Sequence, residues 1–116
     1  MPSRMKDLAP NQADKKSIEL FAVLCKALGH PARIMIIDYL KKIDRCICGE
    51  IVELLPLAQS TVSQHLKCLK NAGLIKGQVE GSKTCYCLDR EMLEKFTDLV
   101  DALYEAKGSI HIEDCR

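Results

Sequence analysis

Apolar positions recur at helical spacing in several separate segments of the chain. This period predicts a first helix over residues 14–28 with Asp14 as its N-cap, a second over 31–42 that begins with a proline, a third over about 49–55 and a last over about 89–107. The core that these helices bury must be aliphatic, because the chain has no Trp, two Phe and three Tyr. A mainly α-helical fold is therefore expected.

The pattern changes after the third predicted helix. Residues 57–73 predict a turn, a helix and a glycine stop, and residues 74–79 and 84–88 flank a turn-rich stretch, as in a β-hairpin. Residues 44–49 also break the helical period and predict a short extended piece. Two short helices joined by a tight turn and followed by a hairpin make a winged helix-turn-helix, with the hairpin as the wing. The expected fold is thus mainly α, with about five helices and two or three short strands.

The helix within residues 57–73, here called the reading helix, has one apolar and one polar side. At about 100° per residue, Leu66 and Leu69 fall within about 40° of Val62, so these three predict a buried stripe. The opposite side has no acid and suits a major groove, where small hydroxyls let the backbone approach, Gln pairs with adenine and Lys meets guanine or phosphate. This side consists of Ser60, Gln64, Lys67 and Asn71, flanked by Thr61, Ser63 and Cys68.

Two histidines lie close to this helix or to the turn before it. His65 falls about 60° from the buried stripe, which favours a partly buried histidine bonded to the neighbouring scaffold over a base contact. His30 precedes Pro31 at a helix junction, where a capping or packing role is expected. Neither His30 nor His65 is therefore predicted to contact DNA.

Composition and charge narrow the class of protein. At 116 residues, with 47% apolar and 28% charged positions, the chain has the size of one packed domain, expected at 14–108 between flexible tails at 1–13 and 109–116. The formal net charge of +1 gives no general argument for nucleic-acid binding, but residues 60–83 hold four lysines and one acid, whereas 89–116 are acidic. No apolar run approaches the ~20 residues that span a bilayer, and no leader is visible, so we expect a cytoplasmic protein without a membrane partner.

Five short motifs occur in a fixed order between Phe21 and Leu103. They are Leu28-Gly29-His30-Pro31-Ala32-Arg33, Cys46-Ile47-Cys48-Gly49-Glu50-Ile51, Gln59-Ser60-Thr61-Val62-Ser63-Gln64-His65-Leu66, Leu69-Lys70-Asn71-Ala72-Gly73-Leu74-Ile75 and Glu80-Gly81-Ser82-Lys83. At these spacings they together resemble the ArsR/SmtB family of dimeric, winged-helix metalloregulatory repressors. The resemblance implies that the polar side of the reading helix faces an operator, that the terminal helices dimerise and that inducer binding lowers the affinity for DNA.

The expected DNA contacts join the reading helix to the lysines that follow it. One module of this size gives a small footprint, so we expect a homodimer on double-stranded DNA, at a two-fold inverted repeat with half-sites about one turn apart. The expected DNA-binding residues are Gln59, Ser60, Thr61, Ser63, Gln64, Lys67, Lys70, Lys76 and Lys83.

Seven cysteines are the second notable feature. An odd number in a cytoplasmic protein predicts thiols rather than a disulfide framework. Cys46 and Cys48 share a side on a strand or a distorted helix entrance, and a helix start lowers the pKa of a thiol and favours soft ions. In the family that the chain resembles, such a Cys-x-Cys belongs to a thiolate site for As(III), Sb(III) or Cd(II), and we expect one of these ions as the inducer. Its third ligand is unassigned.

Three further cysteines are alternatives for that ligand. Cys115 near the C-terminus could reach the site from either subunit. If the short extended piece pairs with the second wing strand, Cys85 and Cys87 lie beside Cys46 and Cys48, because alternate residues of a strand share a face. A site that uses Cys46, Cys48 and one or both of the wing cysteines is then an alternative, although simple packing is the preferred interpretation for Cys85 and Cys87. For Cys25 and Cys68, simple packing is the preferred interpretation.

Other interpretations of the same residues stay open. The module could instead act as a thiol redox or reactive-sulfur sensor, or as a regulator without a metal response, although Asp38 and Gly108 occupy the family's paired sulfur-sensing positions. Protein binding without DNA is a further alternative. The last helix echoes the family's zinc site in Asp98, His111 and Asp114, but Val100 and Gly108 interrupt the ligand pattern. An enzyme is not expected, because the spacing suggests no Cys/His/Asp arrangement.

Overall fold

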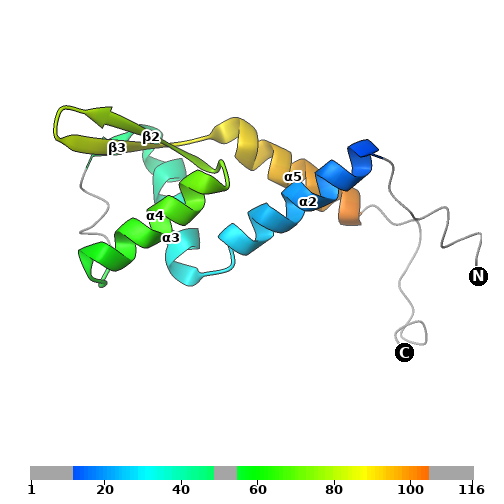
Figure 1. Cartoon of the computed structure of the whole chain (residues 1–116), viewed down its shortest axis with the longest axis horizontal. Coiled ribbons are helices and arrows are strands. Elements are labelled where there is room, and N and C mark those ends of the chain that lie inside the picture. Colours follow the sequence, from blue (N-terminus) through cyan, green and yellow to red (C-terminus); the bar gives the residue numbers. More distant parts are fainter. Residues whose placement is uncertain (1–11, 49–54, 105–116) are drawn as a thin grey trace, which may run out of the picture.

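The computed structural model of the chain describes residues 12–48 and 55–104. Its elements follow one another in the order α2 (Gln12–Ala27), α3 (Pro31–Ile43), β1 (Ile47–Cys48), α4 (Gln59–Asn71), β2 (Ile75–Glu80), β3 (Lys83–Leu88) and α5 (Arg90–Tyr104). α2 and α5 lie side by side at one end of the molecule, and α3, α4 and the sheet lie at the other (Figure 1). Four helices and three strands within these two ranges make a winged helix-turn-helix, which confirms the expected fold class.

Helix α3 has well-defined ends. At its N-terminus, the Nδ1 of His30 accepts a hydrogen bond of 3.1 Å from the backbone N–H of Ala32, and Pro31 occupies the first turn. At its C-terminus, Asp44 adopts a left-handed conformation with φ 53°, and its N–H bonds to the carbonyl of Leu40. The expected capping role of His30 is confirmed.

The sheet is antiparallel and has the order β1-β3-β2. β2 and β3 form the wing, a hairpin that turns through Gly81 with φ +65°, a conformation that glycine adopts without strain. β1 pairs with β3, with Ile47 opposite Tyr86 and Cys48 opposite Cys85. The expected pairing of the short extended piece with the second wing strand is therefore confirmed.

The core is aliphatic, as the composition predicts. Its fully buried side chains come from every described element except α5, and are Leu24, Ile36, Leu40, Ile47, Val62, Leu69, Leu74, Ile75 and Cys85. β1 contributes Ile47, so even this two-residue strand is attached to the core through its apolar side chain. The stripe predicted for the reading helix, which is α4, is buried together with its neighbour His65.

Some predicted boundaries differ from the structure. The first helix begins at Gln12, so Asp14 lies inside α2 and its prediction as the N-cap was wrong, because Gln and Ala before it also favour helix. The third predicted helix, about 49–55, falls outside the described residues except for Leu55. The last helix begins at Arg90 and is described to Tyr104. In the described ranges no single helix is long and apolar enough to cross a membrane, and one bent pair, Lys15–Ala27 with Pro31–Ile43, meets the length and composition test jointly.

Candidate nucleic-acid interface and thiol site

The reading helix presents a polar, acid-free surface to solvent. Val62, His65, Leu66 and Leu69 are buried on one side. Every residue expected to bind DNA is exposed, on α4, on β2 or at the start of β3; these are Gln59, Ser60, Thr61, Ser63, Gln64, Lys67, Lys70, Lys76 and Lys83. Of these, Lys76 stands 3.9 Å from a carboxylate oxygen of Asp89, while its side chain remains 69% exposed. The surface is therefore accessible and carries uncompensated positive charge on α4.

A groove extends this positive surface toward the first two helices. It has a volume of about 720 Å³ and lies between the C-terminal end of α2, the start of α3 and the polar side of α4. Its walls include Lys26, Arg33 and Lys67, and its described lining holds no acidic residue. A phosphate oxygen is the chemical group that such a wall attracts most strongly. Sequence reasoning did not single out Lys26 or Arg33, because they lie far from the reading helix along the chain.

The reading helix is held against the wing by one long side chain. A Cβ added to Gly77 on β2 would lie 3.3 Å from the Cε and 3.4 Å from the Nζ of Lys70 on α4. The side chain of Lys70 therefore rests on the backbone of the wing strand, at a position where a glycine leaves room for it. Its charge lies at the junction of the helix and the wing.

Arg33 joins three elements beside the groove. Its Nε donates to the Nδ1 of His65 at 3.2 Å, and its Nη1 donates to the carbonyls of Lys26 and Ala27, each at 3.1 Å. The ring of His30 packs against that of His65, with centroids 4.4 Å apart and the ring planes tilted by 47°. Burial first, and then the nearby charges of His30 and Arg33, lower the pKa of His65 below 6.5. The prediction that His65 is buried and bonded to the scaffold is confirmed.

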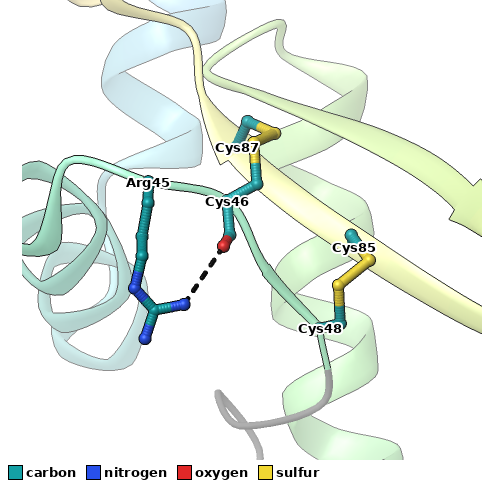
Figure 2. The surroundings of a disulfide bond; sticks show 5 residues. All are labelled: Arg45, Cys46, Cys48, Cys85 and Cys87. Atoms are coloured by element: carbon teal, nitrogen blue, oxygen red, sulfur yellow. Dashed lines mark hydrogen bonds between the residues drawn. A yellow bond between two sulfur atoms is a disulfide. The ribbon is translucent and has the colours of Figure 1, made fainter.

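Four cysteines meet where β1 pairs with β3. Cys46 is disulfide-bonded to Cys87 and Cys48 to Cys85, with Cα atoms 4.3 Å and 4.1 Å apart (Figure 2). Residues directly opposite in an antiparallel pair, at sites without ladder hydrogen bonds, come this close. The expectation that these cysteines are thiols was wrong for this structure, because the strand register brings each pair to bonding distance. Of the described cysteines, Cys25 and Cys68 are free.

The two bonded pairs differ in their access to solvent. Cys85 is 2% exposed and Cys48 is partly buried, whereas Cys46 is exposed and Cys87 is partly buried. Cys46 and Cys87 also line a small cavity of about 170 Å³ together with Arg45 and Arg90. Cys68 packs partly against the core, Cys25 is exposed on α2, and Cys115 lies outside the described residues.

The donor set around these cysteines fits a thiophilic ion once the sulfurs are reduced. Cys46, Cys48, Cys85 and Cys87 occupy alternate positions of two paired strands, so all four sulfurs lie on one face of the sheet. Soft thiolates are the ligands that As(III), Sb(III) and Cd(II) prefer. A carboxylate, that of Glu80, lies within 4.8 Å of the sulfurs of Cys48 and Cys85. Glu80 was not predicted from the sequence, although a register with Gln78 opposite Cys85 places residue 80 on the same face.

Large apolar side chains are exposed along the two terminal helices. In the part of α5 that the structure describes, no residue is buried, and Leu103 and Tyr104 are 74% and 85% exposed. On α2, Ile18 is 56% exposed. α2 and α5 contact each other through Phe21 and Phe96, whose rings meet edge to face at 5.8 Å.

The fold and the reading helix together define the class of winged helix-turn-helix transcriptional regulators. Residues 30–76 match the family model for bacterial regulatory proteins of the arsR family. The chain is 36% identical over 90 residues to an uncharacterized HTH-type transcriptional regulator of Methanocaldococcus jannaschii, an alignment that covers 77% of this chain and 96% of that protein. The chain belongs to the arsR family, a family of regulators and not of enzymes, as the motifs predict.

Two further similarities extend over most of the chain. The arsenical resistance operon repressor of Staphylococcus xylosus is 29% identical over 87 residues, which cover 75% of this chain and 83% of that protein. The structure of reduced HlyU from Vibrio cholerae is similar with a TM-score of 0.61 at 31% identity, and covers 83% of this chain and all of that chain. The similarity therefore includes the terminal helices as well as the winged module.

Proposed function

We propose that the protein is a cytoplasmic, homodimeric repressor of the arsR type, which binds an inverted-repeat operator and releases it when a thiophilic ion binds through Cys46 and Cys48. The observation that carries the DNA-binding half is the exposed, acid-free side of the reading helix. Its hydroxyl and amide groups suit base edges, and the lysines of α4 and the wing suit phosphates.

The groove beside the reading helix supports the same proposal. Lys26 and Arg33 bring positive charge from α2 and α3 to the side of α4 that carries Gln64 and Lys67. A duplex with its backbone along this groove meets cations on both sides of the reading helix. Phosphate contacts of this kind supply most of the sequence-independent affinity of DNA-binding proteins.

A homodimer is supported by the uncovered apolar surface of α2 and α5. Exposed apolar patches of this kind mark association surfaces. A two-fold dimer through these helices carries two reading helices, and an inverted repeat is the DNA symmetry that matches it.

The cysteine cluster supports the inducer half. Cys85 and Cys87 lie directly across from Cys48 and Cys46, so these two wing cysteines, rather than Cys115, are our choice for the additional ligands. In the reduced state, each facing pair offers two soft donors from two strands. An ion held by both strands changes how β1 and the wing are attached, and this is how ion binding is coupled to the affinity for DNA. A coupling of about 1–3 kcal/mol suffices for a 5–150-fold change.

Thiol redox control is the second candidate, and the two disulfides favour it. In the closing step, each pair of thiols reacts with a small-molecule disulfide, forming the cross-strand bond and releasing two molecules of the small thiol. Disulfides are rare in cytoplasmic proteins and there tend to be redox-sensing. Both candidates use the same four cysteines and the same DNA-binding surface.

The test is a selection of binding sites from random duplexes by the reduced protein, followed by titrations of the selected duplex. We expect an inverted repeat to be enriched, and its affinity to fall at least about fivefold with As(III), Sb(III) or Cd(II). The double variant Cys46→Ser/Cys48→Ser should bind the duplex as the parent does but ignore the ion. Failure to enrich any sequence would overturn the proposal that the protein binds a specific operator.

The same titrations of the selected duplex test thiol redox control, through the change in DNA affinity on oxidation. A small-molecule disulfide replaces the ion, and its effect is compared with that on the matched control Cys25→Ser/Cys68→Ser, which removes the two described free cysteines. If the oxidant weakens binding and the ions do not, the redox candidate replaces the ion-sensing one. If neither changes the affinity, the protein is a regulator without a thiol inducer.

A further inference from the structure

The buried cysteine pair has a third neighbour from another strand. The sulfurs of Cys48 on β1 and Cys85 on β3 and a carboxylate oxygen of Glu80 on β2 all lie within 4.8 Å of one another. Gln78 is the register partner of Cys85, and Glu80 follows two positions later, so its side chain shares their face of the sheet. All three strands thus contribute one donor to a single point.

The donor types at this point differ from those at the exposed pair. Zn(II) and Cd(II) accept a mixture of thiolate and carboxylate ligands, whereas As(III) and Sb(III) are held by thiolates. We propose that reduced Cys48 and Cys85, together with Glu80, form a site for a divalent ion of the zinc and cadmium class. This inference rests on the proposed thiol-based function and specifies one ligand set and one class of ion within it.

Formation of the site has a defined chemical balance. Two molecules of a small thiol first reduce the Cys48–Cys85 bond, giving two cysteine thiols and one molecule of the small disulfide. Binding of the divalent ion then displaces the two thiol protons to solvent, while Glu80 binds as the carboxylate. Because the same two sulfurs cannot be bonded to each other and to an ion, the disulfide and the ion exclude one another.

The position of Glu80 gives the site a link to the wing. Glu80 is the last residue of β2 and pairs with Lys83 across the hairpin turn. An ion that binds Glu80 and both cysteines therefore joins the end of the wing strand to β1, as the disulfide alone does not. The ion therefore acts on the strand end that lies opposite Lys83, one of the lysines proposed to bind DNA.

The experiment titrates Cd(II), and separately As(III), into the fully reduced protein. Cd(II) binding is followed by thiolate charge-transfer absorption, and its affinity is obtained by competition with a chelator; Zn(II) is measured by competition with Cd(II). We expect Glu80→Gln to weaken Cd(II) binding at least about tenfold while the absorption per bound ion is kept, because both thiolates remain. As(III) binding should not change. Glu91→Gln, on the exposed first turn of α5, is the matched control.

Variants of the cysteines separate this inference from the proposed function. Cys48→Ser should abolish the high-affinity Cd(II) absorption, and Cys46→Ser/Cys87→Ser should preserve it. If Glu80→Gln binds Cd(II) as the parent does while Cys48→Ser does not, Glu80 is no ligand and this inference fails, although the thiol site stands. If Cys48→Ser and Cys46→Ser/Cys87→Ser both bind every ion as the parent does, the thiol site fails as well.

Discussion

The Nε of Arg33 donates a hydrogen bond of 3.2 Å to the Nδ1 of His65. Arg33 is on α3 and His65 is on the reading helix, so this bond fixes one helix against the other at a point where the histidine is only 8% exposed. Because Nδ1 accepts the bond, His65 is neutral and carries its proton on Nε2. The orientation of the reading helix therefore depends on an uncharged histidine.

Acidification should weaken the folded state through this histidine. The pKa of His65 is lowered in the fold, so below 6.5 the unfolded chain takes up a proton that the folded chain does not. The contribution is complete above pH 6.5 and is lost as the pH falls toward the lowered pKa, with a slope of at most about 1.4 kcal/mol per pH unit. Urea unfolding at a series of pH values from about 7 to 5 measures it.

The variant His65→Asn tests the assignment. Asn keeps an acceptor for Arg33 but does not titrate, so its free energy of unfolding should be flat over this range. Asp38 does not interfere, since its hydrogen bond to Lys42 lowers its pKa below 3.8 and its contribution is lost only under stronger acid. An equal slope in His65→Asn would show that another group is responsible.

Truncation of the buried stripe should be costly. Leu69 is a fully buried residue on the core-facing side of α4. Leu69→Ala should lower the free energy of unfolding by about 2–5 kcal/mol, through lost burial and the cavity that remains. Val79→Ala is the control, because Val79 is 77% exposed on the wing and should change stability by less than about 0.5 kcal/mol. Denaturant titrations measure both.

Removal of one reading-helix cation should change the salt dependence of DNA binding. For Lys67→Ala we expect weaker binding to specific and non-specific duplexes alike, and a plot of log affinity against log salt that is shallower by about one unit. Lys95→Ala, on exposed α5, should leave both quantities unchanged. If Lys67→Ala behaves like this control, the alternative of a protein-binding module without DNA gains support.

A charge placed on the terminal helices should separate the subunits. Leu103→Glu and Ile18→Glu each put a carboxylate on the exposed apolar surface of α5 or α2, where a partner would bury it without a compensating group. Sedimentation equilibrium should detect monomers at concentrations where the parent is dimeric. Val79→Glu, equally polar but on the wing, should stay dimeric, and dissociation of that control would place the interface elsewhere.

Reduction of the disulfides should destabilise the fold. The two bonds link residues 41 and 37 positions apart, and closing a loop of this size contributes about 4 kcal/mol. The loops are nested, so the second bond adds less than the first. Thermal unfolding with and without a reductant should give a lower Tm for the reduced protein, and Cys46→Ser/Cys87→Ser should lie between the two. Equal Tm values would contradict the prediction.

The helical parts of the fold were predictable because their signals are local. The glycine that ends the reading helix, Gly73, has a φ of +87°, and the alternation of Val62, Leu66 and Leu69 with polar residues survives intact in the structure. His30 and Pro31 were likewise sufficient to predict where α3 begins. The start of α2 was misplaced, because a favourable cap residue such as Asp14 is also tolerated inside a first turn.

The site was less predictable because it depends on contacts distant in sequence. The alternation of cysteines predicted that those of each strand lie on one face of the sheet. Only the register of β1 on β3 determines that Cys46 meets Cys87 and Cys48 meets Cys85. The spacing of the cysteines along the chain does not determine whether the facing sulfurs are thiols or a disulfide. Arg33 could not be assigned from sequence either, since its partner His65 is 32 residues away.

The reading helix and the wing strand are held together through the core by the buried side chains of Leu69 and Ile75, and the Lys70 side chain lies along Gly77. The groups that enter the groove of a duplex and those on the wing then keep a constant offset. A target with a single base pair inserted between the two sets of contacts would lose one of them. The domain therefore selects for distance along the double helix as well as for base identity.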